Sequence, residues 1–398
     1  MAINFQQVRE KIQQIGAGAA QRQIILEERQ ADARTLLRTH ADGLDTLRER
    51  VDAARAVDAG LRCAMPLNEK LNSSIPLPAL PEQATLIAAD GSQIAPDRHE
   101  QIQFGLVNVG GIVMRLNSGE STLIHTDSVL MYDLDLFRNG VPLSDGMVAL
   151  ERDLQERSQL AELARDYDAP VVTFTDGPIE LWGAREGEEA KAYYESLEKY
   201  KGVLSRLQSR GVITAGYVDK PASDLVVRLL ELAKAAPEDM QDIRNYHPLL
   251  GVTDRFLFGN GMELLLKPGH RSAVFSIQSR SEKNYPGVLA LHFFYLNAAA
   301  EEKHPHIARV EIPRWVVDDP AMLGMLHAVL VDQCRIMGAR PYPYLLHRAH
   351  ETAVVSNEEK YQVEQMLVQE LRRNGADVEA GSNKQSAKDL PRRTGYKP

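Results

Sequence analysis

The chain has 398 residues and a formal net charge of -9, with 44% hydrophobic and 25% charged residues. This composition is typical of a folded globular protein, and it excludes one that coats nucleic acid through bulk positive charge. No apolar run reaches the ~20 residues that span a bilayer, and the N-terminus lacks a signal-peptide pattern. We therefore expect a cytoplasmic protein without a membrane partner. Cys63 and Cys334 are too few for a disulfide framework, so both are expected to be reduced and buried.

Residues 1–65 predict a helical extension. Val8, Ile12 and Ile15 recur at helical spacing, and the apolar residues between Leu37 and Ala54 do the same. This spacing fits a hairpin or coiled coil that binds a partner, and it fits equally well helices that pack on their own domain. A proline-rich linker is expected over residues 66–83.

A large α/β domain is predicted over residues 84–380. Its first strand, Ala84–Ala89, ends in Asp90-Gly91-Ser92, where the glycine is expected to let the backbone turn. Strands are predicted at Phe104–Val109 and Gly111–Leu116, joined by a hairpin turn at Gly110-Gly111. A third strand is expected at Thr122–His125.

The same pattern returns at Val171–Thr175, an apolar strand that ends in Asp176-Gly177-Pro178. Further strands are predicted at 212–218, 273–278, 288–296 and 307–312, and helices at 145–167, 186–209, 224–235, 320–337 and 345–356. A basic tail over 381–398 is expected to be disordered.

The two Asp-Gly sites are the first candidates for chemistry. Ligands of open α/β sheets lie beyond the carboxyl ends of strands. If the two strands are neighbours, Asp90 and Asp176 converge, and converging carboxylates bind a divalent metal, share a proton or repel each other. The alternative is structural, because Asp-Gly is a common turn dipeptide and Asp a common helix cap.

A third candidate lies near the C-terminus, in the segment Tyr342-Pro343-Tyr344-Leu345-Leu346-His347-Arg348-Ala349-His350. The prolines predict an extended entry to a helix that carries His350. A single histidine on a half-apolar helix is more often a core residue than a ligand. The residues alone leave both readings open.

Four motifs in this order resemble the NurA nuclease family. They are the strand ending in Asp90-Gly91-Ser92, then Asp176-Gly177-Pro178, then Val310-Glu311-Ile312-Pro313, and Tyr342-Pro343 with Ala349-His350. No single motif is specific, whereas the order and separations are. The resemblance covers roughly residues 84–356.

The resemblance implies an RNase H-like mixed β-sheet flanked by helices, a homodimer, and a Mn²⁺-dependent deoxyribonuclease. In this family the enzyme degrades DNA with 5′-to-3′ polarity and works with a HerA-type hexameric ATPase in DNA end processing. The family's two strand carboxylates match Asp90 and Asp176, and its C-terminal tyrosine and histidine match Tyr342 and His350. Its helix carboxylate matches Glu156, with Glu151 as the alternative.

The chemistry of these residue types agrees with that assignment. Two divalent ions ~3.5–4 Å apart can serve the attacking water and the leaving oxygen of a phosphodiester. The expected metal ligands are Asp90, Asp176, Glu156 and His350. Mn²⁺ is the expected ion because it accepts an imidazole ligand more readily than Mg²⁺ does, and Mg²⁺ is the alternative. Tyr342 is a candidate for contact with a phosphate or a base.

Lys220 and Arg271 are the favoured contacts to the DNA backbone. The competing function is a non-catalytic DNA-clamp or adaptor subunit of the ATPase. A phosphatase with an aspartate nucleophile is disfavoured, because Ser92 stands where its second aspartate is required.

Overall fold

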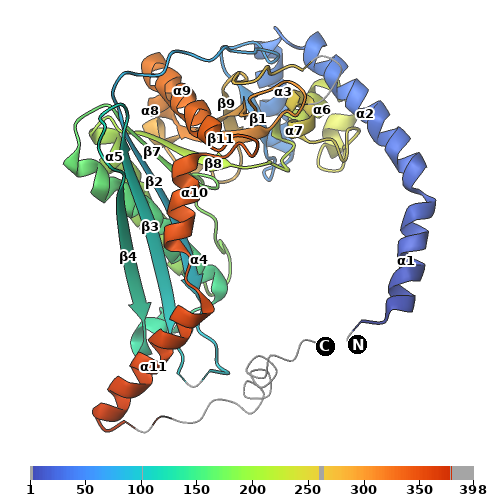
Figure 1. Ribbon diagram of the computed structural model, residues 1–398. Coiled ribbons are helices and arrows are strands. Elements are labelled where there is room, and N and C mark those ends of the chain that lie inside the picture. The colour runs from blue at the N-terminus through green and yellow to red at the C-terminus, as the bar shows by residue number, and fades with distance from the viewer. Residues whose placement is uncertain (1–2, 101, 260–263, 377, 379–398) are drawn as a thin grey trace. The chain divides into compact units, whose positions relative to one another are not determined.

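The computed structural model describes all residues except 1–2, 101, 260–263, 377 and 379–398 (Figure 1). The predicted basic tail lies outside the described residues. The chain forms two compact units, Met1–Leu80 with Tyr217–Pro341 and Pro81–Gly216 with Tyr342–Pro398. Among the described residues, no helix combines the length and the apolar character that crossing a membrane requires.

The second unit is built on strands in the order β8-β7-β2-β3-β4. Strands β2, β3 and β4 are consecutive antiparallel neighbours, and β2 pairs with β7 in parallel. Three antiparallel strands, followed after a helix by a strand parallel to the first, form an RNase H-like sheet, which confirms the predicted fold class. The bounds are β2 Thr85–Ile94, β3 Gly105–Arg115, β4 Leu123–Met131, β7 Val171–Asp176 and β8 Ile213–Val218, and β5 Phe137–Arg138 pairs with β6 Val141–Pro142.

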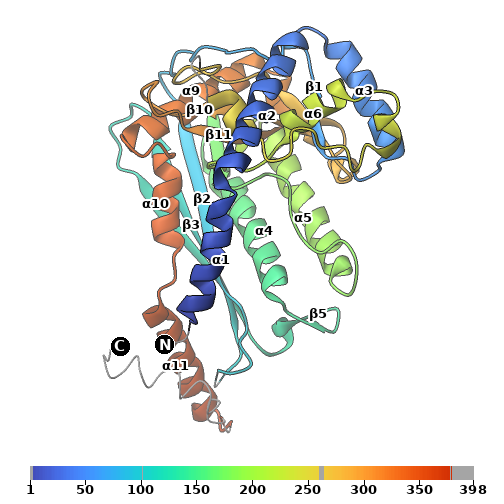
Figure 2. The same ribbon diagram turned by 90° about the vertical axis from the view of Figure 1, so that its right-hand side faces the viewer.

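Helices cover both faces of this sheet (Figure 2). Helix α10 (Tyr344–Ala353) packs on β2 and β3 from one side, and α4 (Asp145–Leu163) packs on the same strands from the other. Two adjacent glycines of β3 allow this close packing. A Cβ on Gly110 would meet the backbone of α10, and one on Gly111 would meet Leu163 and Gln159 of α4. Helix α5 (Ala190–Ser209) packs on α4, and α11 (Asn357–Arg373) follows α10.

The hairpin predicted at Gly110-Gly111 is wrong, because β3 runs without interruption through both glycines. The turn predicted at Asp90-Gly91-Ser92 is also wrong, since these residues lie inside β2 and pair with β3. In both places glycine signals the close approach of a helix instead of a turn. A Cβ on Gly91 would lie 2.8 Å from Glu156 Oε1 and 2.6 Å from Arg152 Cγ of α4.

The first unit contains the strands β1-β9-β10-β11, whose pairs are antiparallel. Stacked Phe275 and Phe293 contribute to its core, with ring centroids 5.5 Å apart. Cys63 and Cys334 are fully buried, as predicted. The bounds are β1 Cys63–Pro66, β9 Phe275–Gln278, β10 Leu291–Asn297, β11 Ile307–Pro313, α6 Leu225–Lys234, α7 Asp254–Gly259, α8 Arg314–Val317 and α9 Pro320–Ile336.

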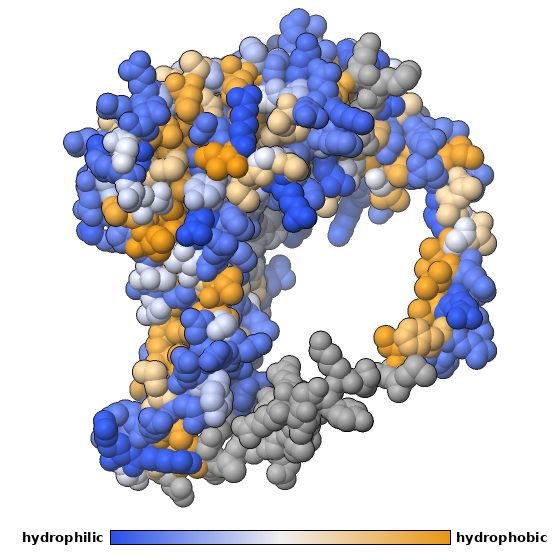
Figure 3. Space-filling model, viewed as in Figure 1, coloured by the Kyte–Doolittle hydropathy of each residue, from blue (hydrophilic) through white to orange (hydrophobic). Residues whose placement is uncertain are grey.

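The N-terminal helices are α1 (Phe5–Ala17), α2 (Ala19–Thr39) and α3 (Leu44–Val57), so this part is helical as predicted. They belong to one unit with Tyr217–Pro341, and a separate extension over 1–65 stays a prediction. Helices α2 and α3 pack on α6, so the reading as helices packed on their own unit holds for this part. Helix α1 buries none of its residues, and its apolar side chains gather along one side (Figure 3). A partner for α1 stays a prediction.

Candidate active site

Five carboxylates line one cavity of about 260 Å³ in the second unit, beside β2 and β7, and three of them are predicted site residues. Ala89 of β2 is in register with Thr175 of β7, so Asp90 and Asp176 follow at adjacent positions. Glu156 of α4 lines the same cavity. The structure therefore brings together the three carboxylates that the sequence analysis selected.

Asp90 binds His350 of α10. Asp90 Oδ2 lies 2.7 Å from His350 Nδ1, and Asp90 Oδ1 accepts a hydrogen bond of 2.9 Å from the backbone N–H of Gly91. An ionised carboxylate can only accept, so the hydrogen bond places the proton of the imidazole on Nδ1. The His350 side chain is 63% exposed, and its Nε2 is the nitrogen left for substrate, water or metal.

The end of α10 is fixed on the sheet, which positions His350. The carbonyl oxygen of Ala353 accepts hydrogen bonds from Ser92 Oγ at 2.5 Å and from Asn108 Nδ2 at 2.8 Å. Ser128 Oγ donates to Asn108 Oδ1 at 2.7 Å. Ser92, which the sequence suggested as a turn residue, thus anchors the helix that carries the histidine.

Glu156 is buried, and its pKa is raised well above the usual value. Burial is the main cause, and the charges of Asp153 and Asp90 add to it, whereas Arg152 and Arg157 oppose it. Arg152 Nε lies 3.3 Å from Glu156 Oε1. Five carboxylates and two arginines line the cavity, so its acidic side chains outnumber its basic ones, and a cation would balance them.

The geometry favours Glu156 over Glu151 as the helix carboxylate. Glu151 forms an ion pair of 3.4 Å with Arg138 and accepts a hydrogen bond of 2.9 Å from Gln155. Glu151 is also absent from the residues that line the cavity. The helical turn between the two positions directs only Glu156 to β2.

The sequence analysis missed Arg152, Asp153 and Arg157, which line the same cavity. Arg152 pairs with Asp153 at 2.7 Å, and burial raises the pKa of Asp153 despite this pair. Arg157 is fully buried and donates hydrogen bonds to Thr175 Oγ1 at 2.6 Å and to Thr214 Oγ1 at 3.1 Å. Charges at i, i+1, i+4 and i+5 along a helix share one face, and this was the available signal.

The donor set fits a hard divalent cation, because Asp90, Asp176 and Glu156 offer the oxygen ligands that Mg²⁺ and Mn²⁺ prefer. The surplus of acidic over basic side chains around the cavity supports the same fit. As the side chains lie, no group of three or more His, Cys, Asp or Glu within the described part of the chain forms a complete set of ligands. A metal site at Asp90, Asp176 and Glu156 stays a prediction, and His350 does not line this cavity.

The other predicted site residues lie elsewhere. Tyr342 precedes α10 and does not line the cavity, so its role stays a prediction. Lys220 is an exposed residue of the first unit with a φ of 45°, and contact with DNA stays a prediction for it too.

Arg271 requires a correction. Its side chain is 8% exposed and binds both carboxylate oxygens of Glu69, at 2.9 and 3.0 Å. The guanidinium also donates a hydrogen bond of 2.8 Å to the carbonyl oxygen of Ser272, so its donors are occupied within the protein. We assign Arg271 a structural role and no longer count it as a DNA contact.

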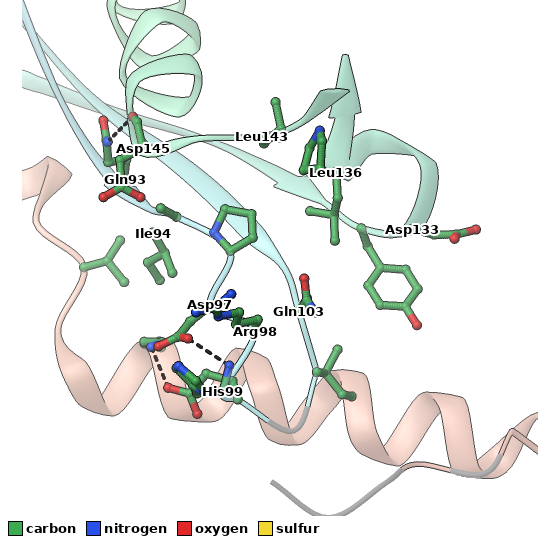
Figure 4. Close-up of a pocket in the computed structure, with 18 of the residues that line it drawn as sticks. Gln93, Ile94, Asp97, Arg98, His99, Gln103, Asp133, Leu136, Leu143 and Asp145 are labelled. Carbon is green, nitrogen blue, oxygen red and sulfur yellow. Dashed lines mark hydrogen bonds and ion pairs between the residues drawn. The ribbon is translucent and has the colours of Figure 1, made fainter. Parts of the chain in front are cut away.

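A larger cavity, of about 1260 Å³, lies elsewhere in the second unit, beside Ile94 and α11 (Figure 4). Its charged side chains are of both signs, and two of them pair with each other, Lys360 with Glu100 at 3.0 Å. Asp97 accepts a hydrogen bond from the backbone N–H of His99. Four carboxylates line it, but the predicted site residues Asp90, Glu156 and Asp176 line the smaller cavity, so we place the candidate site there.

One of the comparisons with known proteins identifies a family. The NurA domain model matches residues 84–355. The NurA nuclease from Sulfolobus solfataricus is similar in structure, with 13% identity and a TM-score of 0.43, over 86% of this chain and 98% of that chain. The catalytic domain of human endonuclease V shows 12% identity and a TM-score of 0.32, over 81% and 98%. No curated protein matches. At these scores and identities, the family rests on the NurA domain match alone.

Proposed function

Because the chain belongs to the NurA family of nucleases, we propose that it hydrolyses phosphodiester bonds of DNA with the help of divalent metal ions. The observation that carries the proposal is the cavity in which Asp90, Asp176 and Glu156 meet and acidic side chains outnumber basic ones. We propose Mn²⁺ as the natural ion, with Mg²⁺ as the substitute and two ions in the site. A DNA substrate also fits the expectation of a cytoplasmic protein.

A bound metal ion would polarise the phosphoryl oxygen and lower the pKa of a coordinated water. Asp90, Asp176 and Glu156 would hold that ion. With its Nδ1–H donated to Asp90, His350 would move protons at Nε2, from the attacking water or to the leaving oxygen. Arg152 would balance the acidic residues on the side of α4.

The finer proposals rest on the family resemblance. They are 5′-to-3′ exonuclease activity with single-strand endonuclease activity, a role in DNA end resection and repair, a HerA-type hexameric ATPase as partner, and a homodimer. Lys220 remains the candidate contact to the DNA backbone.

Removal of divalent metal should abolish cleavage. Purified full-length chain is incubated with end-labelled single- and double-stranded DNA in Mn²⁺, in Mg²⁺ and in EDTA. We expect shortened products with either ion, more of them with Mn²⁺, and none in EDTA, because carboxylates alone cannot activate water against a phosphodiester. Addition of Mn²⁺ beyond the EDTA should restore the products.

The proposal fails if wild-type protein cuts neither substrate with any metal, with or without a HerA-type ATPase. Binding of DNA without cutting would then support the adaptor function. Cleavage that continues in EDTA would instead exclude the metal-dependent chemistry.

A methyl group at Gly91 should damage the site more than the fold. In Gly91→Ala, the new Cβ lies 2.8 Å from Glu156 Oε1 and 2.6 Å from Arg152 Cγ, so both side chains must move. A displacement of about 1 Å can reduce a rate ~100-fold, and overpacking costs about 1–3 kcal/mol. We expect cleavage to fall about 100-fold. The free energy of unfolding should fall by about 1 kcal/mol, the lower end of the overpacking range. Cleavage assays and urea unfolding measure the two effects.

Gly105→Ala is the matched control, because it adds the same methyl group to a neighbouring strand. There the nearest atom is Met131 Cε, at 3.0 Å, the end of a flexible side chain. Equal cleavage by the two variants would contradict the placement of Glu156 against Gly91.

A further inference from the structure

An exposed tryptophan lines the cavity that contains the carboxylates. Trp182 follows β7 and is 50% exposed, and it lines the cavity together with Asp90 and Asp176. The chain contains two tryptophans, and the other, Trp315, is 8% exposed. Leaving a large aromatic side chain in water forgoes about 1.5–3 kcal/mol of burial. The indole shares its cavity with two predicted site residues, which makes it a candidate for contact with the substrate.

The segment that carries Trp182 is held in place just before the indole. Tyr200 Oη donates a hydrogen bond of 2.8 Å to the carbonyl oxygen of Ile179, and Tyr193 Oη donates one of 3.4 Å to that of Leu181. Both apolar side chains, Ile179 and Leu181, are buried. The exposure of Trp182 is therefore set by an anchored backbone, not by a loose loop.

A guanidinium lies over the indole. The Cζ atom of Arg185 is 5.5 Å from the Trp182 ring centroid and 5.8 Å from that of Tyr193. Arg185 also pairs with buried Glu180 at 2.9 Å, which fixes its position. An aromatic surface with an arginine beside it is the combination that binds a nucleobase and its phosphate in single-stranded nucleic acid.

We propose that Trp182 is a stacking residue for a nucleobase of single-stranded DNA next to the acidic cavity. The inference rests on the proposed nuclease function. Every nucleobase has a π-face, so such stacking is independent of sequence, and only a single strand presents that face. The indole lines the same cavity as Asp90 and Asp176, so a base stacked on it would bring its strand next to the carboxylates.

The test measures binding in the Asp90→Asn background with Mg²⁺, so that the DNA stays intact. Titration with oligothymidylate should quench tryptophan emission, and Trp182→Phe should remove the quenched component because Trp315 is buried. Loss of stacking costs about 1–3 kcal/mol per base, which is a dissociation constant about 5- to 150-fold higher for Trp182→Ala. Trp182→Phe should have a dissociation constant between those of its parent and Trp182→Ala. Blunt duplex DNA should cause no quenching.

Tyr194→Ala is the control, since Tyr194 is 44% exposed beside Tyr193 but does not line the cavity. Its affinity for oligothymidylate should be unchanged. Trp182→Ala that binds as tightly as its parent would overturn the proposal and assign the indole to a protein partner, as would quenching that persists in Trp182→Phe.

Steady-state cleavage separates this inference from the proposed function. In Trp182→Ala with Asp90 intact, KM for single-stranded DNA should rise while kcat changes little, because the indole binds the substrate without touching the reacting atoms. Wild-type protein that quenches with DNA but never cuts it would refute the nuclease and leave the binding site. Wild-type protein that cuts, with the same KM in Trp182→Ala, would refute the stacking and leave the nuclease.

Discussion

Asp90→Asn should reduce DNA cleavage at least ~1000-fold while the protein stays folded. A metal ion contributes several kcal/mol to stabilising a phosphodiester transition state, and each 1.36 kcal/mol is tenfold in rate. Asparagine has the size of aspartate and retains an oxygen that can accept the hydrogen bond from Gly91. It lacks the charge that a metal requires and that orients the imidazole of His350. Cleavage of end-labelled DNA in Mn²⁺ measures the loss.

Stability gives this variant a second signature. Asp90 is one of the like charges that raise the pKa of Glu156, after burial and Asp153. Removing that charge relieves repulsion, so in metal-free buffer Asp90→Asn should unfold at the same urea concentration as wild type or a higher one. A residue that costs stability and supplies activity belongs to a functional site.

Asp127→Asn is the matched control, because Asp127 lies on β4 of the same sheet and is exposed. It should cut DNA as wild type does. Residual cleavage in Asp90→Asn above one hundredth of wild type would place the chemistry elsewhere. A fall of equal size in Asp127→Asn would indicate damage to the sheet instead of loss of a ligand.

The part of the candidate site that could be predicted consists of residues at the ends of apolar strands. Apolar runs of strand length ended at Asp90 and Asp176, and parallel neighbours carry the residues that follow them to one place. For the helix carboxylate, the sequence left two candidates, Glu151 and Glu156. Periodicity places both on the helix before β7, but only the packing of α4 on Gly91 decides which one reaches β2.

What the sequence misled on was glycine. The sequence does not tell why a glycine is required at Gly91, Gly110 and Gly111. A glycine can allow a positive φ in a turn, or it can leave space for a neighbouring element that packs closely. In β2 and β3 they lie in extended strands, and what requires them is a helix from a distant part of the chain. The sequence analysis also missed Arg152, Asp153 and Arg157. Charged residues on a helix are normally exposed to solvent, so the sequence did not mark these three as lining a cavity.

Gly110→Ala should strongly destabilise the second unit. Its Cβ would lie 2.5 Å from the carbonyl oxygen of Ala349 and 2.8 Å from the backbone nitrogen of Ala353. These are backbone atoms of α10, which cannot move without the helix, so the overpacking cost should reach the upper part of the range of about 1–3 kcal/mol. Urea unfolding at constant m measures it.

Cleavage should fall in the same variant, because a shift of α10 moves His350 away from Asp90. Gly202→Ala is the control: it lies in α5 with nothing within 4 Å of its Cβ, and alanine there should add about 0.5–1 kcal/mol. Unfolding of Gly110→Ala at the wild-type urea concentration would mean that α10 does not rest on β3. A stable but inactive Gly110→Ala would instead show that the sheet tolerates the methyl group and the histidine does not, because catalysis requires a finer placement of α10 than folding does.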